Sequence, residues 1–142
     1  MDNDLKARCN AIEECYEFML AYAAQGVVEE AGSQSAGQLR TFLERAESAL
    51  DGLADAYLAV VERGGFEPAN RYRAFIEVLD RDARSALSAV RLVIAQPSIS
   101  SQLVDNLNAS IHVRALLTDL FLIDEILEAH QRNLHSARPG RA

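Results

Sequence analysis

Few side chains in this sequence could do chemistry: it has two cysteines, three histidines and four tyrosines. Cys9 and Cys15 are six residues apart on one predicted helix. That spacing separates their Cα atoms by about 9 Å, which is beyond disulfide reach. They also lack the close spacing and the His partners of a zinc site. We therefore expect two free thiols, no metal site and no cofactor.

The histidines do not complete a known catalytic or metal-binding pattern. No Glu stands three residues before His112, His130 or His135, so the Glu-x-x-His motif of carboxylate-bridged di-iron bundles is absent. A nucleophilic site needs a Cys or Ser next to a His that a third group orients. Cys9 or Cys15 would meet His112 only by chance across two helices. The sequence therefore predicts no catalytic residue and favours a protein that is not an enzyme.

A line of polar residues follows one edge of the segment 100–130, namely Asp105, Asn108, His112 and Asp119. The 100° step of an α-helix places these side chains close to one direction. They form either a solvated strip between two contact faces or a hydrogen-bonded set that fixes helix register inside the bundle or interface. A ligand site is a third interpretation. The sequence alone does not decide among the three.

Three tyrosines, Tyr16, Tyr57 and Tyr72, lie on the apolar seams of three predicted helices. A buried tyrosine hydroxyl needs a hydrogen-bond partner. These residues are either core tyrosines with satisfied hydroxyls or, together with His112, the lining of a small-molecule pocket between helices. The second possibility gives the alternative function, a small-molecule-binding four-helix bundle with an interior pocket lined by Tyr and His.

Apolar residues recur at alternating three- and four-residue intervals through most of the chain, which is typical of amphipathic helices. The expected helices span residues 4–24, 35–63, 68–95 and 100–130. Gly26, the pair at 64–65 and Pro97 stand where helices should stop. Gly52 falls inside the second helix, and because the apolar register continues across it we expect a slight bend there. Residues 27–37 are expected to be a linker.

The chain has 142 residues, which is the size of one ordinary domain. Short connections between helices favour antiparallel neighbours. We therefore predict an all-α fold, an antiparallel up-down-up-down four-helix bundle that dimerises. The bundle domain should span residues 1–133, and residues 134–142 should form a short flexible basic tail.

The segment 100–130 carries more apolar surface than one packing face needs. Ile111, Ala115, Leu122 and Ile126 form a second apolar stripe beside its core-facing seam. The first helix has a similar ridge, made of Cys15, Phe18 and Tyr22. Left in water, such surface forms a sticky patch, so we predict a homodimer, or a higher assembly, through the first and last helices.

Composition narrows the possible partners. The net charge of −7 argues against nucleic-acid binding and against acidic membrane surfaces. No window approaches the roughly 18 apolar residues of a membrane span, and the N-terminus has no export signal. The absence of an apolar span and of an export signal, together with the expected free thiols, predicts a cytoplasmic location. The leading hypothesis is a non-enzymatic accessory or regulatory protein that binds itself through helix faces, with another protein as a further candidate partner.

Overall fold

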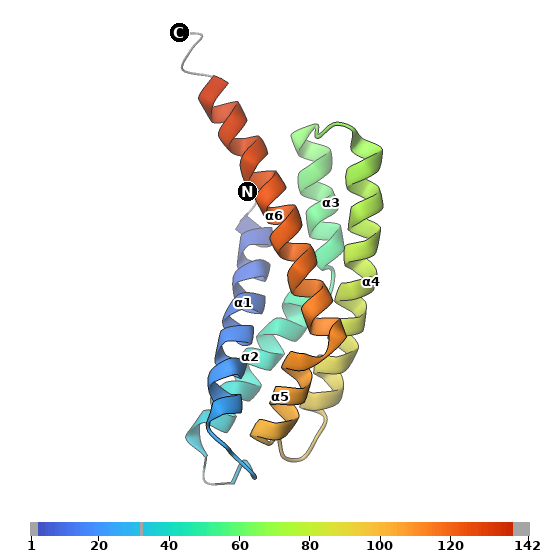
Figure 1. Ribbon diagram of the computed structural model, residues 1–142. Coiled ribbons are helices and arrows are strands. Elements are labelled where there is room, and N and C mark those ends of the chain that lie inside the picture. Colours follow the sequence, from blue (N-terminus) through green and yellow to red (C-terminus); the bar gives the residue numbers. More distant parts are fainter. Residues whose placement is uncertain (1–2, 32, 138–142) are drawn as a thin grey trace.

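A computed structural model describes residues 3–31 and 33–137 of the chain (Figure 1). These residues form an all-α domain without a strand. Its helices are α1 (Asn3–Ala24), α2 (Gln34–Leu50), α3 (Leu53–Gly64), α4 (Ala69–Ile94), α5 (Ser101–Ala109) and α6 (Ile111–Ala137). The described part of the chain therefore has six helices, because two of the four helices predicted from the sequence are each broken in two.

The helices alternate in direction and surround one apolar core. In Figure 1, α1 and α4 run downwards, whereas α2–α3 and α5–α6 lead back up. α1 packs against α2 and α5, and α4 packs against α2, α3 and α6. α6 continues as a helix to Ala137, past the domain end expected at residue 133. The rest of the expected tail, residues 138–142, lies outside the described residues.

The first break lies at Gly52, where the sequence analysis expected only a bend. Asp51 is extended, with φ −71° and ψ 112°, and Gly52 has a φ of 83°. A left-handed conformation is costly for residues with a Cβ, and glycine adopts it freely. Gly52 therefore ends one helix and allows a second to start in a new direction.

Arg8 of α1 stabilises this break. Its guanidinium donates hydrogen bonds to the backbone oxygens of Ala49, at 3.0 Å, and Asp51, at 2.7 Å. The last carbonyl groups of a helix have no partner within the helix, and a cation also interacts favourably with the negative end of the helix dipole. Arg8 thus supplies the polar partners that the end of α2 would otherwise lack.

The second break lies at Ser110, so the prediction of one uninterrupted helix over residues 100–130 is wrong. Ser110 is extended, with φ −64° and ψ 143°. Its hydroxyl accepts a hydrogen bond from the backbone N–H of Val113, at 3.3 Å, which is the N-cap interaction of a new helix. Serine can thus start a helix inside an apolar sequence that contains no Pro or Gly.

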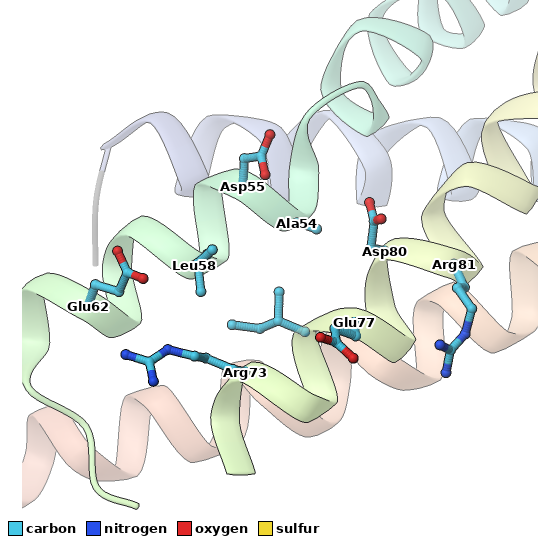
Figure 2. A pocket seen from close by; sticks show the side chains of 9 residues that line it. Ala54, Asp55, Leu58, Glu62, Arg73, Glu77, Asp80 and Arg81 are labelled. Atoms are coloured by element: carbon cyan, nitrogen blue, oxygen red, sulfur yellow. The ribbon is translucent and has the colours of Figure 1, made fainter. Parts of the chain in front are cut away.

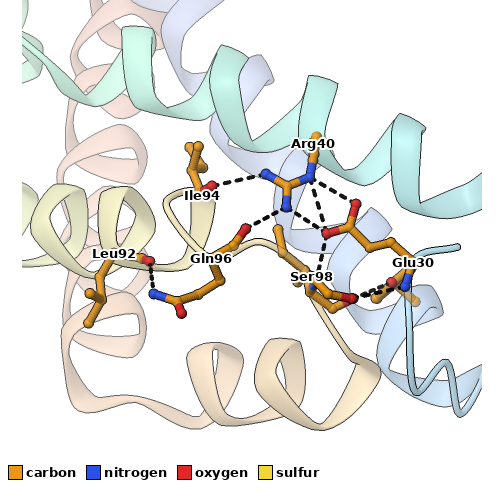
Figure 3. Close-up of polar contacts among 8 residues, drawn as sticks. Glu30, Arg40, Leu92, Ile94, Gln96 and Ser98 are labelled. Atoms are coloured by element: carbon orange, nitrogen blue, oxygen red, sulfur yellow. Dashed lines mark hydrogen bonds and ion pairs between the residues drawn. The ribbon is translucent and has the colours of Figure 1, made fainter.

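A partly buried ion pair between Arg40 and Glu30 ties α2 and the segment 25–31 to the 95–100 loop (Figure 3). Arg40 of α2 donates to both carboxylate oxygens of Glu30, and also to the backbone oxygens of Ile94 and Gln96. Glu30 in turn accepts from the backbone N–H of Ile99, at 2.6 Å. Hydrogen bonds from Arg40 hold the pKa of Glu30 below its ordinary value. The segment expected to be a plain linker is therefore anchored at this end of the domain.

Among the described residues, no helix combines the length and the apolar character that crossing a bilayer requires.

The break at Gly52 can be tested with two Gly→Ala variants. We expect Gly52→Ala to lower the free energy of unfolding by about 1–2 kcal/mol, because alanine would be held at positive φ. Gly37→Ala is the matched control. Its added Cβ meets no atom within 4 Å, and Gly37 lies in helix α2. We expect that control to be neutral or stabilising by up to about 1 kcal/mol. Urea denaturation measures both, and equal effects would contradict the strained geometry at Gly52.

Candidate functional site

The outer face of α6 carries large apolar side chains that the chain itself leaves uncovered. Ile111 is 74 % exposed, Leu122 52 % and Ile126 41 %. Ala115, between them on the same face, is half-buried. These four residues are the α6 part of the interface predicted from the sequence, and we call them the α6 stripe. The core-facing side of α6 is separate and includes buried Leu116, Leu120 and Leu127.

An apolar groove adjoins the α6 stripe, between α6 and the first turns of α4. Its lining is Arg71, Tyr72, Phe75, Leu122, Ile123 and Ile126, and its volume is about 240 Å³. Leu122 and Ile126 therefore belong both to the stripe and to the groove. Tyr72 and Phe75 extend the exposed apolar surface from α6 onto α4.

The α1 part of the predicted interface needs correction. Cys15 is 2 % exposed and Tyr22 is fully buried, so both belong to the core of this chain. The reason is that α1 is covered on more than one side, by α2 and by α5. Phe18 is half-buried and stacks on Phe42 of α2, with ring centroids 4.7 Å apart. Only Phe18 keeps part of its surface available to a partner.

The predicted set of Tyr16, Tyr57, Tyr72 and His112 is dispersed. Tyr57 is fully buried, whereas Tyr16 and Tyr72 are half-buried and His112 is exposed. Of the four surface hollows that we describe, only the apolar groove includes one of these residues, Tyr72. Because His112 is exposed, these four side chains do not together line an interior pocket in the described part of the chain.

Tyr57 instead lies in a buried hydrogen-bonded chain that links three helices. Its hydroxyl donates to Asp124 Oδ1 of α6, at 2.6 Å. Having used its one proton there, the hydroxyl accepts from the Cys9 thiol of α1, at 3.1 Å. Burial raises the pKa of Cys9 to about 11, that of Tyr57 above its ordinary range, and that of Asp124 above its usual value. The sequence analysis missed Asp124, whose only signal was a carboxyl group near the core side of α6.

The predicted polar line is divided by the break at Ser110. Asp105 and His112 are exposed, whereas Asn108 and Asp119 are 9 % and 8 % exposed. Neither amide atom of Asn108, nor Oδ2 of Asp119, has a hydrogen-bond partner among the described residues. The interpretation as a solvated strip therefore fits Asp105 and His112, whereas Asn108 and Asp119 are buried.

Asp119 of α6 lies beside Asp82 of α4. Burial of the Asp119 carboxyl group raises its pKa most. A hydrogen bond with Asp82 and the negative charge of Asp82 raise it further, to about 7. The pair thus favours holding one proton between two carboxyl groups at mildly acid pH. In the described part of the chain neither carboxyl group forms an ion pair with a basic side chain, so the shared proton is what relieves their repulsion.

A larger hollow lies between α3 and α4 and is lined mainly by charged side chains (Figure 2). It has a volume of about 430 Å³ and includes Asp55, Glu62, Arg73, Glu77, Asp80 and Arg81. All six of these side chains are exposed or half-buried, so water screens their charges. Nothing in this arrangement desolvates a carboxyl group for acid–base chemistry.

The described residues contain no group of three or more His, Cys, Asp or Glu side chains arranged to hold a metal ion. Cys9 and Cys15 are free, and burial raises the pKa of Cys15 to about 12. A reactive cysteine needs a lowered thiol pKa and access to solvent. Both thiols have the opposite properties and act as core side chains.

Comparison with protein families, with curated proteins and with solved structures gives no match for this chain.

The buried hydrogen-bonded chain can be tested by removing its central hydroxyl. We expect Tyr57→Phe to lower the free energy of unfolding by about 1–3 kcal/mol, because Asp124 and Cys9 would both lose their partner. Tyr16→Phe is the control, since the Tyr16 hydroxyl has no hydrogen bond in the described part of the chain. Its effect should stay within about 0.5 kcal/mol. Chemical denaturation of both variants provides the comparison, and equal losses would argue against the network.

Asp119 should make stability depend on pH. Its pKa is near 3.8 without the fold and about 7 within it, so between these values the folded state binds more protons than the unfolded state. The free energy of unfolding should therefore fall as pH rises from about 4 to 7. We expect Asp119→Asn to remove this fall and to stabilise the protein at pH 8 by on the order of 1–2 kcal/mol. Thermal melts across this pH range measure the change in stability, and Asp105→Asn, at an exposed carboxyl group, is the control. If both variants gave the same dependence of stability on pH, Asp119 would not be its source.

Proposed function

We propose that this protein is a non-enzymatic accessory or regulatory interaction module that associates with a second copy of itself through the α6 stripe. The observation that carries the proposal is the exposure of Ile111, Leu122 and Ile126 on one helix face, at 74 %, 52 % and 41 %. Fully burying one such side chain contributes roughly 1.5–3 kcal/mol. Covering all three on each chain would therefore supply several kcal/mol toward association.

Other features agree with this proposal. We infer that the domain is an up-down-up-down four-helix bundle whose second and fourth helices are each broken in two, with the stripe on the fourth. Both cysteines are free and buried, which is compatible with a reducing cytoplasm. The net charge of −7 disfavours nucleic acid as a partner. A further protein partner could use exposed apolar residues outside the stripe, such as Leu92 of α4.

Small-molecule binding is the second candidate function, and the apolar groove beside α6 is the observation that favours it. Its lining is almost wholly apolar, with Arg71 as the only charged residue. Its volume of about 240 Å³ is below the 300–1,000 Å³ typical of ligand pockets. We therefore favour a protein side chain as its occupant. Native mass spectrometry of protein purified from cells distinguishes the two, since a retained compound would add mass to the chain.

Association through the α6 stripe is tested by placing charge in its centre. We expect the double variant Leu122→Glu, Ile126→Glu to sediment with the mass of one chain, 15.6 kDa, because burying carboxylates in an apolar interface is costly. The wild-type protein should sediment as a dimer or larger.

The matched control is Leu20→Glu on α1, a leucine of similar exposure, 49 %, that lies on another helix. It should keep the wild-type mass. Circular dichroism checks that both variants stay folded. A folded double variant that retains the wild-type mass, or a wild type that sediments as a single chain at micromolar concentration, would overturn the proposal.

A further inference from the structure

The spacing of the α6 stripe is symmetric along the helix. Ile111, Ala115, Leu122 and Ile126 are separated by four, seven and four residues. Read in either direction, the order of spacings is the same. A two-fold axis perpendicular to α6 and close to Thr118 would therefore bring each stripe residue of one chain opposite a stripe residue of the other.

We propose that two copies of this protein pack their α6 helices antiparallel about this axis. The inference rests on the proposed function and specifies its geometry. Ile111 of one chain then lies opposite Ile126 of the second copy, and Ala115 lies opposite Leu122 of the second copy. The small side chain of Ala115 leaves room for the larger Leu122, as interdigitated helix packing requires. A parallel pair would instead place each residue opposite itself, with Leu122 against Leu122 and Ala115 against Ala115.

Charged residues beside the stripe support the same arrangement. Arg114 and Glu125 lie on one flank of the stripe, within about 20° of each other around the helix, on the side away from the apolar groove. A two-fold axis maps this flank onto the same flank of the second copy. Arg114 of each chain therefore comes within about one helical turn of Glu125 of the other, and each dimer gains two opposite-charge pairs.

The competing contacts of these two residues are weak. Glu125 accepts from Arg132 of its own chain, at 3.3 Å, but these side chains are 69 % and 61 % exposed. Solvent screens a pair this exposed, so it contributes little to stability. The guanidinium of Arg114 has no partner among the described residues. Glu125 is thus free to exchange its partner on association.

The apolar groove provides a packing site in the dimer for Ile111, the most exposed member of the stripe. In the antiparallel pair, Ile111 of the second copy reaches Ile126, which lines the groove together with Tyr72 and Phe75. An isoleucine side chain is a suitable occupant for a shallow apolar groove of about 240 Å³. The groove and the stripe therefore form a single contact surface.

Cysteine cross-linking tests the geometry directly in the full-length protein. Thr118 lies beside the proposed axis, so Thr118→Cys should form an intermolecular disulfide under mild oxidation. Ile111→Cys alone should not, because its two copies would be about 22 Å apart. Mixing Ile111→Cys with Ile126→Cys should give the crossed dimer. The native cysteines, 7 % and 2 % exposed, add little background.

Exposed Leu20→Cys on α1 is the control for random collision and should stay uncross-linked. Cross-linking of Ile111→Cys to itself, at a yield equal to that of Thr118→Cys, would overturn the antiparallel arrangement while leaving self-association through α6 in place. A wild-type protein that stays a single chain would overturn both the arrangement and the proposed function.

Charge reversal provides a second readout that does not depend on disulfide formation. We expect Arg114→Glu to weaken the dimer by about tenfold in Kd, since two attractive pairs become repulsive. Glu125→Arg should weaken it similarly, and the double exchange should recover most of the loss. Sedimentation equilibrium measures all three. Additive losses in the double variant, without recovery, would contradict the pairing of Arg114 with Glu125.

Discussion

The backbone break at Ser110 determines which surfaces of the C-terminal third meet the rest of the chain. Before the break, α5 packs along α1; after it, α6 packs on α4. A single straight helix has one axis and would not follow both neighbours. The break therefore buries Val104 and Leu107 on one side of the domain and Leu116, Leu120 and Leu127 on another. It also turns the α6 stripe outwards, where the described helices leave Ile111, Leu122 and Ile126 largely exposed.

Polar groups connect the helices that the breaks separate. Tyr57 joins α3 to Asp124 of α6 and to Cys9 of α1, and Arg8 of α1 closes the end of α2. At the other end of the domain, Ser101 donates to the backbone oxygen of Tyr22 and accepts from the N–H of Val27. Apolar packing alone allows helices to slide or rotate. A buried hydrogen bond has one satisfied geometry, so these contacts fix how the short helices meet.

The helical content and most of the core could be predicted from sequence because apolar residues at helical spacing specify a buried face. The two breaks could not be predicted by the same reasoning. The spacing of apolar residues continues without interruption across Gly52 and Ser110. That spacing carries no information about the positive φ of Gly52 or about the N-cap hydrogen bond that Ser110 makes. Of the residues predicted for an interface, Ile111, Leu122 and Ile126 of α6 are exposed, whereas Cys15 and Tyr22 of α1 are buried in the core. The sequence pattern shows only that Cys15 and Tyr22 lie on an apolar face of a helix. That α2 and α5 cover this part of α1 follows from the packing of the helices.

Electrostatics favour the α6 stripe as the contact surface of the proposed dimer. Each chain carries a net charge of −7, so two copies repel one another at long range. Around the α6 stripe the balance differs, since the exposed residues Arg71, Arg114 and Arg132 lie near it beside Glu125. This local mixture of signs replaces repulsion with neutral or attractive contact at short range. In the proposed dimer, apolar area would supply the free energy of association, and the arginines would determine where on an acidic surface two copies can meet.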